Sequence, residues 1–183
     1  MRSPRSRTWA RRGIIPVIRV RQGGTGHISV AGLACYRPGH RTRLIYRLRL
    51  YRGRKSETQA FTWAGYRDLL TAAHRQMPGG NIVLVWDNLP VHLRAELRAF
   101  TSVQPWLRVF QLPSYVPDLN PLEGIWSVLK RGMLANQAAA SYARLFQVIR
   151  HSLQKIQRQP GPLEGCLAGT GLTPQPDGTD ITN

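Results

Sequence analysis

The run NIVLVW at residues 81–86 limits the fold more than any other stretch of the 183-residue chain. It is continuously apolar and rich in β-branched side chains, and it is too short to cross a bilayer. Such a run is typical of a buried strand that is covered on both faces. We therefore predict an α/β domain in which helices pack on the faces of a sheet.

Alternating patterns predict the neighbouring elements. Residues 27–36 are apolar on both alternating faces, which indicates an interior strand. Residues 43–52 alternate apolar side chains with Arg43, Arg47 and Arg49, which indicates a half-exposed strand with a basic outer row near a sheet edge. A further short strand is expected at 107–113, and helices are expected at 62–76, from about Pro90 to Phe100, from Pro121 to about Gly132, and at 141–157.

Positive charge is concentrated in the first third of the chain. The net charge is +17, and residues 1–55 contain 15 Lys or Arg and no acid, since Glu57 is the first acidic residue. Such a block attracts phosphates, so we expect a nucleic-acid partner with salt-dependent binding. The alternatives are a solvated basic face and charge protection of a sheet edge. The N-terminus lacks the apolar core of a secretory signal, and Cys35 and Cys166 form no motif, so we expect a cytoplasmic protein that does not enter membranes.

Asp87 ends the buried apolar run, at the end of a strand where α/β proteins place ligands. A buried carboxylate there needs hydrogen bonds, a cation or a water-filled cleft. The alternative is a turn in which Asp87 and Asn88 satisfy their own backbone. The tripeptide WDN alone slightly favours the turn.

Glu123 lies in the first turn of a predicted helix. Asn120 is placed to cap that helix, Pro121 takes its first position, and Glu123 follows three residues after the cap. This is the pattern of a capping box, and taken alone it is the simpler interpretation. However, the 35 residues between Asp87 and Glu123 (88–122) hold a helix, a strand and a loop, a path that can return the chain to the same end of the sheet. Two converging carboxylates repel each other unless a divalent cation lies between them, and oxygen ligands suit Mg²⁺ or Mn²⁺.

The segments VLVWDNLPVH and LPSYVPDLNPLEGIWSVLKR together resemble the DDE transposases of the mariner-type superfamily, in their bacterial insertion-sequence branch. The resemblance runs from about Thr8 to Leu172 and includes RTWARRG near the start and AGTGL near the end. It implies a ribonuclease-H-like mixed sheet flanked by helices, two Mg²⁺ or Mn²⁺ ions in the complete enzyme, and cleavage and strand transfer of DNA at transposon ends and target. It makes Asp87 and Glu123 the second and third acids of a metal-binding catalytic triad.

The same resemblance suggests supporting residues and a division of the chain. Asn88, His92 and Asn120 are candidates for groups that shape the site without binding the metal, although His92 is as readily explained as a histidine at a helix start. Arg43, Arg47, Arg49, Lys130 and Arg131 are candidate DNA contacts. Residues 1–13 would be a basic arm, 14–158 a partial catalytic domain, and 159–183 an irregular tail; the protein would be nucleoid-associated when bound to DNA.

One part of the family pattern has no counterpart. The first acid of the triad precedes the stretch like RTWARRG, on the central strand of the sheet, and no acid precedes Glu57 here. We therefore expect a sheet without its first, central strand and a chain that is catalytically inactive alone. Three readings stay open: the catalytic part of a split transposase that needs an N-terminal portion or companion polypeptide, a decayed remnant, or a basic nucleic-acid-binding module. The oligomeric state is also open, with a homodimer as one possibility.

Overall fold

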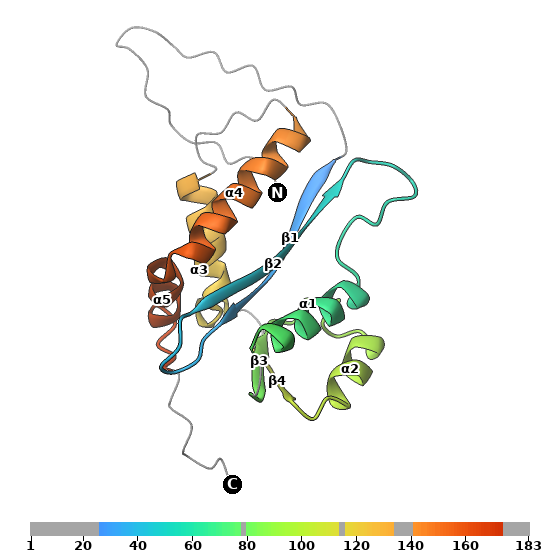
Figure 1. Cartoon of the computed structure of the whole chain (residues 1–183). Coiled ribbons are helices and arrows are strands. Elements are labelled where there is room, and N and C mark those ends of the chain that lie inside the picture. Colours follow the sequence, from blue (N-terminus) through green and yellow to red (C-terminus); the bar gives the residue numbers. More distant parts are fainter. Residues whose placement is uncertain (1–25, 78–79, 114–115, 134–140, 174–183) are drawn as a thin grey trace, which may run out of the picture.

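The computed structural model describes residues 26–77, 80–113, 116–133 and 141–173, so the basic arm 1–13 and the end of the tail lie outside the described residues. The described part is a mixed α/β structure with two small sheets and five α-helices (Figure 1). Its elements are β1 (His27–Cys35), β2 (Arg43–Tyr51), α1 (Trp63–Gln76), β3 (Ile82–Trp86), α2 (Ala95–Ser102), β4 (Leu107–Gln111), the 3-10 turn η1 (Pro117–Leu119), α3 (Pro121–Val128), the π-helical turn η2 (Leu129–Met133), α4 (Tyr142–Arg158) and α5 (Pro160–Ala168).

The first two strands form a long antiparallel hairpin, as their alternation predicts. The turn between them has Pro38 followed by Gly39 at a φ of 71°, and the His40 N–H donates to the Arg37 carbonyl over 3.1 Å. These are the features of a type II turn, which needs a residue that accepts positive φ at its third position. The turn fixes the register that pairs Cys35 with Arg43 and places apolar side chains of both strands on shared faces.

Helices α3, α4 and α5 cover one face of this hairpin (Figure 1). Leu44 of β2, Ile149 and Leu153 of α4, and Leu163 of α5 are all fully buried in one cluster there. The periodic apolar side chains of α4 predict this burial, and Ser141 starts the helix by accepting a hydrogen bond from the Arg144 N–H at 3.2 Å.

Helix α1 lies on the opposite face and also reaches the second sheet. Its Leu69 and Ala73 pack with Ala31 and Ile45 of the hairpin, whereas its Leu70 packs in a separate cluster with residues of β3 and β4. Leu33 of β1 contacts both clusters. One helix therefore joins the two sheets on one side (Figure 1).

The second sheet is a parallel pair of strands, β3 and β4. Only one face of β3 is covered by described residues: Leu84 and Trp86 are buried, whereas Val83 and Val85 are 62% and 45% exposed. The prediction of a strand buried on both faces is therefore wrong for the described structure. The reason is that a continuous apolar run shows which faces could be buried and does not specify a covering element.

The tail and one helix start also differ from expectation. Residues 160–168, predicted as irregular, form α5, with Pro160 in the first turn, where a missing N–H costs no helical hydrogen bond. Full burial of Leu163 stabilises this helix despite its Gly and Pro content. Helix α2 begins at Ala95, so the residues from Pro90 to Leu93 form turns instead of the predicted helix start.

Among the described residues β1 pairs with β2 and β3 pairs with β4, and no described strand joins β1 to β3. The absence of a central strand stays a prediction, because residues 1–25 lie outside the described residues. No helix in the described part of the chain combines the length and apolar character needed to cross a membrane.

Candidate functional site

Asp87 lies directly after β3, and its side chain is 48% exposed. Oδ1 accepts the Leu89 N–H at 3.2 Å, which is the local turn that the sequence allows. The same oxygen lies 2.9 Å from Nδ1 of His92. Both contacts use Oδ1, so Oδ2 has no hydrogen bond within the described part of the chain.

The His92 ring packs against the rings of Trp86 and Tyr66. It stacks on Trp86 with a centroid separation of 4.5 Å and an interplanar angle of 6°, and it meets the Tyr66 ring edge-on at 4.7 Å and 89°. The His92 side chain is only 10% exposed, and its Nε2 is buried without a hydrogen-bond partner among the described residues. Residue 92 is thus fixed in a turn by packing and by Asp87, and it is not part of a helix.

Tyr66 of α1 is a residue near this site that the sequence reasoning missed. Its half-buried ring meets the His92 ring edge-on, and burial followed by the negative charge of Asp87 raises the pKa of Tyr66 above its usual value. Nothing in the local sequence of α1 distinguishes Tyr66 from an ordinary core residue. Asn88, predicted as a supporting group, donates from Nδ2 to the Leu112 carbonyl at 2.9 Å and so ties the end of β3 to the end of β4.

Helix α3 carries Glu123 in its first turn, as predicted. Asn120 caps the helix by accepting the Leu122 N–H on Oδ1 at 3.1 Å, and Pro121 occupies the first turn. The Glu123 side chain is exposed and forms no hydrogen bond or ion pair with another described residue. The reciprocal bond of a capping box is therefore not made, and the Glu123 carboxylate is available to other partners.

The two acids belong to different parts of the fold. Asp87 follows a strand of the β3–β4 sheet, whereas α3 packs on β1, where the Trp126 ring lies against Gly32. The described residues contain no group of three or more His, Cys, Asp or Glu side chains placed to hold a metal ion. The donor chemistry still fits a hard divalent cation, because both acids offer carboxylate oxygens that accept no hydrogen bond from a described residue, and Mg²⁺ commonly takes one or two carboxylates with water and phosphate oxygens.

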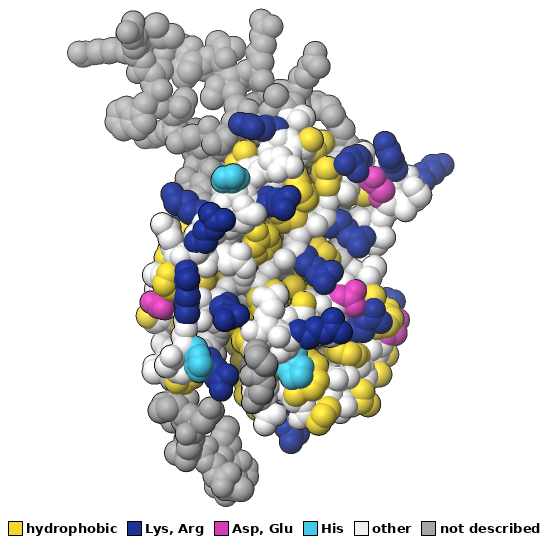
Figure 2. All heavy atoms as spheres, in the orientation of Figure 1, with side chains coloured by type: hydrophobic (Ala, Val, Ile, Leu, Met, Phe, Trp, Pro, Cys, Tyr) yellow, Lys and Arg dark blue, Asp and Glu magenta, His cyan; other side chains and the backbone are white. Residues whose placement is uncertain are grey.

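The candidate DNA contacts differ in their surroundings. Arg43 donates from Nη1 to the Gln76 carbonyl at 3.0 Å, at the end of α1, and Arg49 lies over the Phe61 ring at 5.6 Å. Arg47 is exposed between them on β2. In η2, Lys130 is exposed, and Arg131 donates from Nε to Ser127 at 2.7 Å. Figure 2 shows Lys and Arg side chains spread over one face of the molecule with few acids among them.

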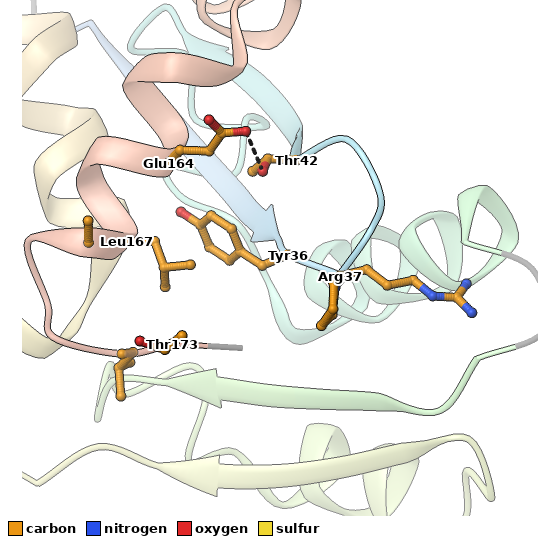
Figure 3. Close-up of a pocket in the computed structure, with 9 residues that line it drawn as sticks. Tyr36, Arg37, Thr42, Glu164, Leu167 and Thr173 are labelled. Carbon is orange, nitrogen blue, oxygen red and sulfur yellow. Dashed lines mark hydrogen bonds between the residues drawn. The ribbon is translucent and has the colours of Figure 1, made fainter. Parts of the chain in front are cut away.

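A pocket lies apart from the predicted site residues, where the hairpin turn meets α5 (Figure 3). Tyr36 donates its hydroxyl to the Leu163 carbonyl at 3.0 Å, and Thr42 donates to Glu164 at 3.4 Å. Burial, with smaller contributions from Cys166 and Cys35, raises the pKa of Tyr36. These polar groups bond to one another and hold α5 on the hairpin, so we assign them a structural role.

The chain matches a model of a known protein family. The model of the family described as DDE superfamily endonuclease matches residues 1–145. A protein of Shigella sonnei described as "Insertion element IS630 uncharacterized 39 kDa protein" is 29% identical over 84 residues, which are 46% of this chain and 24% of that protein. The chain therefore spans about a quarter of this relative.

Solved transposase structures resemble the chain at low identity. The catalytic domain of Mos1 mariner transposase matches with a TM-score of 0.46 and 18% identity, over 81% of this chain and 83% of that one. The Mos1 transposase paired-end complex with the left transposon end matches with a TM-score of 0.47 and 17% identity, over 94% of this chain and 52% of that one.

Proposed function

The chain belongs to the DDE superfamily endonucleases, and from that premise we propose that it is the catalytic part of a transposase that cuts and joins DNA when an insertion sequence moves. The observation that carries the proposal is Asp87, a half-exposed carboxylate at the end of β3 with one oxygen that bonds to no described residue. Glu123 supports it, because its carboxylate is not used to cap α3.

Asp87 and Glu123 are the residues that would hold the divalent cation, Mg²⁺ or Mn²⁺. Such an ion, or a pair of them, would offset the charge of the scissile phosphate and favour in-line attack on it. The chain's own contribution is to fix the direction of the two carboxylates. The Asp87 oxygen that bonds to Leu89 and His92 holds that side chain, and Asn120 fixes the first turn from which Glu123 projects.

We further propose that the 183 residues alone do not cut DNA. The family pattern has an acid before the stretch like RTWARRG, and the sequence has none before Glu57. The described residues place β1 and β3 in separate sheets, and this supports the proposal, because an additional extended segment that joined the two sheets could bring the missing carboxylate. That segment would come from an N-terminal portion or a companion polypeptide.

A nicking assay on the cognate transposon ends tests this proposal. We expect no Mg²⁺- or Mn²⁺-dependent cleavage by the 183-residue chain and cleavage when it is joined to the residues encoded directly upstream. The joined protein should lose activity with Asp87→Asn or Glu123→Gln and keep it with Asp118→Asn, since Asp118 is an exposed acid of the neighbouring turn η1. Cleavage by the 183 residues that Asp87→Asn abolishes would refute the claim of inactivity. A joined protein indifferent to both substitutions would refute the catalytic assignment.

A second candidate function is DNA binding without catalysis. The net charge of +17 favours it. In this case the joined protein would bind DNA and show no metal-dependent cleavage. The nicking assay therefore separates the two functions.

A further inference from the structure

The geometry of the Asp87–His92 contact makes His92 the hydrogen-bond donor and Asp87 the acceptor. His92 Nδ1 lies 2.9 Å from Asp87 Oδ1 and 3.2 Å from the Asp87 backbone carbonyl, and both are acceptors. Nδ1 can therefore make these contacts only when it carries a hydrogen. The other ring nitrogen, Nε2, is buried and has no acceptor among the described residues, so a hydrogen there would be an unsatisfied donor.

The surroundings of His92 hold the ring in this orientation. Trp86 stacks on one face at an angle of 6°, and Tyr66 contacts the ring edge-on at 89°. Trp86 precedes Asp87 directly, so the end of β3 supplies both the stacking surface and the acid. The turn from Leu89 to His92, closed by the His92 N–H donating to the Leu89 carbonyl at 2.8 Å, brings the ring back over that strand end.

We propose that His92 is a positioning residue for Asp87: its Nδ1–H holds Oδ1, so that Oδ2 is the oxygen presented to a divalent cation. The inference rests on the proposed function, because it requires Asp87 to bind a cation. Hydrogen bonds to a ligand carboxylate limit its rotation and raise metal affinity, and removing such a partner typically costs about 10- to 100-fold in affinity. If His92 only packed against Trp86 and Tyr66, its replacement by another ring would not change the metal affinity.

His92→Phe separates these two roles, because phenylalanine can still stack on Trp86 and lacks the donor. His92→Asn is the complementary variant, since an asparagine amide can donate from about the position of Nδ1. His74→Phe is the matched control: His74 also stacks on a tryptophan, Trp106, at 4.1 Å and 9°, and it has no acid partner in the described structure.

The first measurement is the affinity for Mn²⁺ of the chain joined to the residues encoded directly upstream, followed by electron paramagnetic resonance of the free ion. We expect His92→Phe to weaken binding about 10-fold or more, His92→Asn to recover part of that loss, and His74→Phe to match the wild type. Asp87→Asn should weaken binding at least as much as His92→Phe. If Asp87→Asn weakens binding and His92→Phe does not, the positioning role is wrong and the metal site stands. If the wild type does not bind Mn²⁺ or Asp87→Asn leaves binding unchanged, the proposed metal site is wrong and the inference falls with it.

The second measurement needs no metal. Long-range ¹H–¹⁵N correlation spectra of the full chain, with His92 identified by its loss in His92→Asn, report which ring nitrogen carries the hydrogen. We expect a hydrogen on Nδ1, because both groups that Nδ1 contacts are acceptors. A ring protonated on Nε2 alone would contradict the proposal whatever the metal measurement gives.

Discussion

At the scale of single residues, hydrogen bonding separates the acids that serve the fold from those that remain available. Glu57 is used structurally, because its Oε2 accepts the Arg52 N–H at 2.6 Å. Asp87 uses one oxygen in the same way and keeps the other free, and Glu123 keeps its whole carboxylate free of the described residues. The residue type alone does not distinguish these three cases, since the distinction lies in which donors each side chain meets.

A first prediction concerns the contact that seats α3 on β1. A Cβ at Gly32 would lie 3.0 Å from Cη2 of Trp126, closer than ordinary packing allows. Gly32→Ala should therefore lower the free energy of unfolding by about 1–3 kcal/mol through overpacking, although alanine in a strand would otherwise be favourable. Urea unfolding of the single variant, of Trp126→Leu and of the double variant measures the coupling. An equal cost of Gly32→Ala with and without Trp126 would contradict the steric explanation.

A second prediction concerns Cys35. Burial raises the pKa of its thiol from 9.0 to about 11, against the weaker opposing effect of Arg43. The folded state therefore holds the thiol proton more tightly than the unfolded state, so the stabilisation is full below pH 9 and is lost as the pH rises towards 11. We expect the wild type to lose about 1–3 kcal/mol more than Cys35→Ala between these pH values. Denaturant unfolding of both proteins at several pH values measures the difference, and parallel pH profiles would contradict it.

At the scale of elements, burial decides which segments become regular. Helix α5 forms at a sequence with two prolines and two glycines, and its burial of Leu163 in the main cluster offsets that weak helix propensity. Strand β3 shows the converse. Its apolar residues alternate between buried and exposed, because the described structure offers a covering layer on one side only.

A third prediction follows for α5. Leu163 is fully buried, so Leu163→Ala should lower the free energy of unfolding by about 2–5 kcal/mol. Leu172 is 45% exposed, so Leu172→Ala should change it by no more than about 0.5 kcal/mol. Thermal or denaturant unfolding compares the two variants. Similar small effects would mean that α5 does not contribute to the core.

At the scale of the whole molecule, the described residues form two pairs of strands joined on one side by α1 (Figure 1), and Lys and Arg side chains are spread over the face that Figure 2 shows. The acids at 87 and 123 lie on elements attached to different sheets. Under the proposed function, their convergence on one cation would depend on how the two sheets are held together. A central strand that paired with both β1 and β3 would fix that relation.

A fourth prediction concerns DNA binding by the whole chain. The excess of positive charge should give binding that is largely independent of sequence and that weakens about 10³- to 10⁵-fold between 50 and 200 mM salt if 6–10 phosphates are contacted. Arg47→Ala should reduce the salt slope by about one unit, since Arg47 is exposed on β2. Arg67→Ala is the control, because Arg67 is engaged with Asp68 at 2.8 Å. Fluorescence anisotropy at several salt concentrations measures the slopes, and salt-independent binding would contradict the prediction.

The sequence by itself determined the local structure. Alternation placed β1 and β2, helical periodicity placed α1 and α4, and the pair Asn120–Pro121 placed the start of α3. These features depend on residues within one or two helical turns or strand repeats of each other. A short stretch of sequence is therefore enough to predict them. The family also followed from the sequence, because the segments around Asp87 and Glu123 form a specific pair at their spacing.

Only the tertiary structure decided the rest. It placed the His92 ring between Trp86 and Tyr66 against Asp87, left Glu123 without a capping bond, exposed one face of β3 and folded residues 160–168 into α5. Each of these outcomes depends on which distant segment packs against which, and therefore on burial and hydrogen-bond donors supplied from elsewhere in the chain. A local pattern states what a residue can do, whereas its packed neighbours determine which of those options has the lowest free energy.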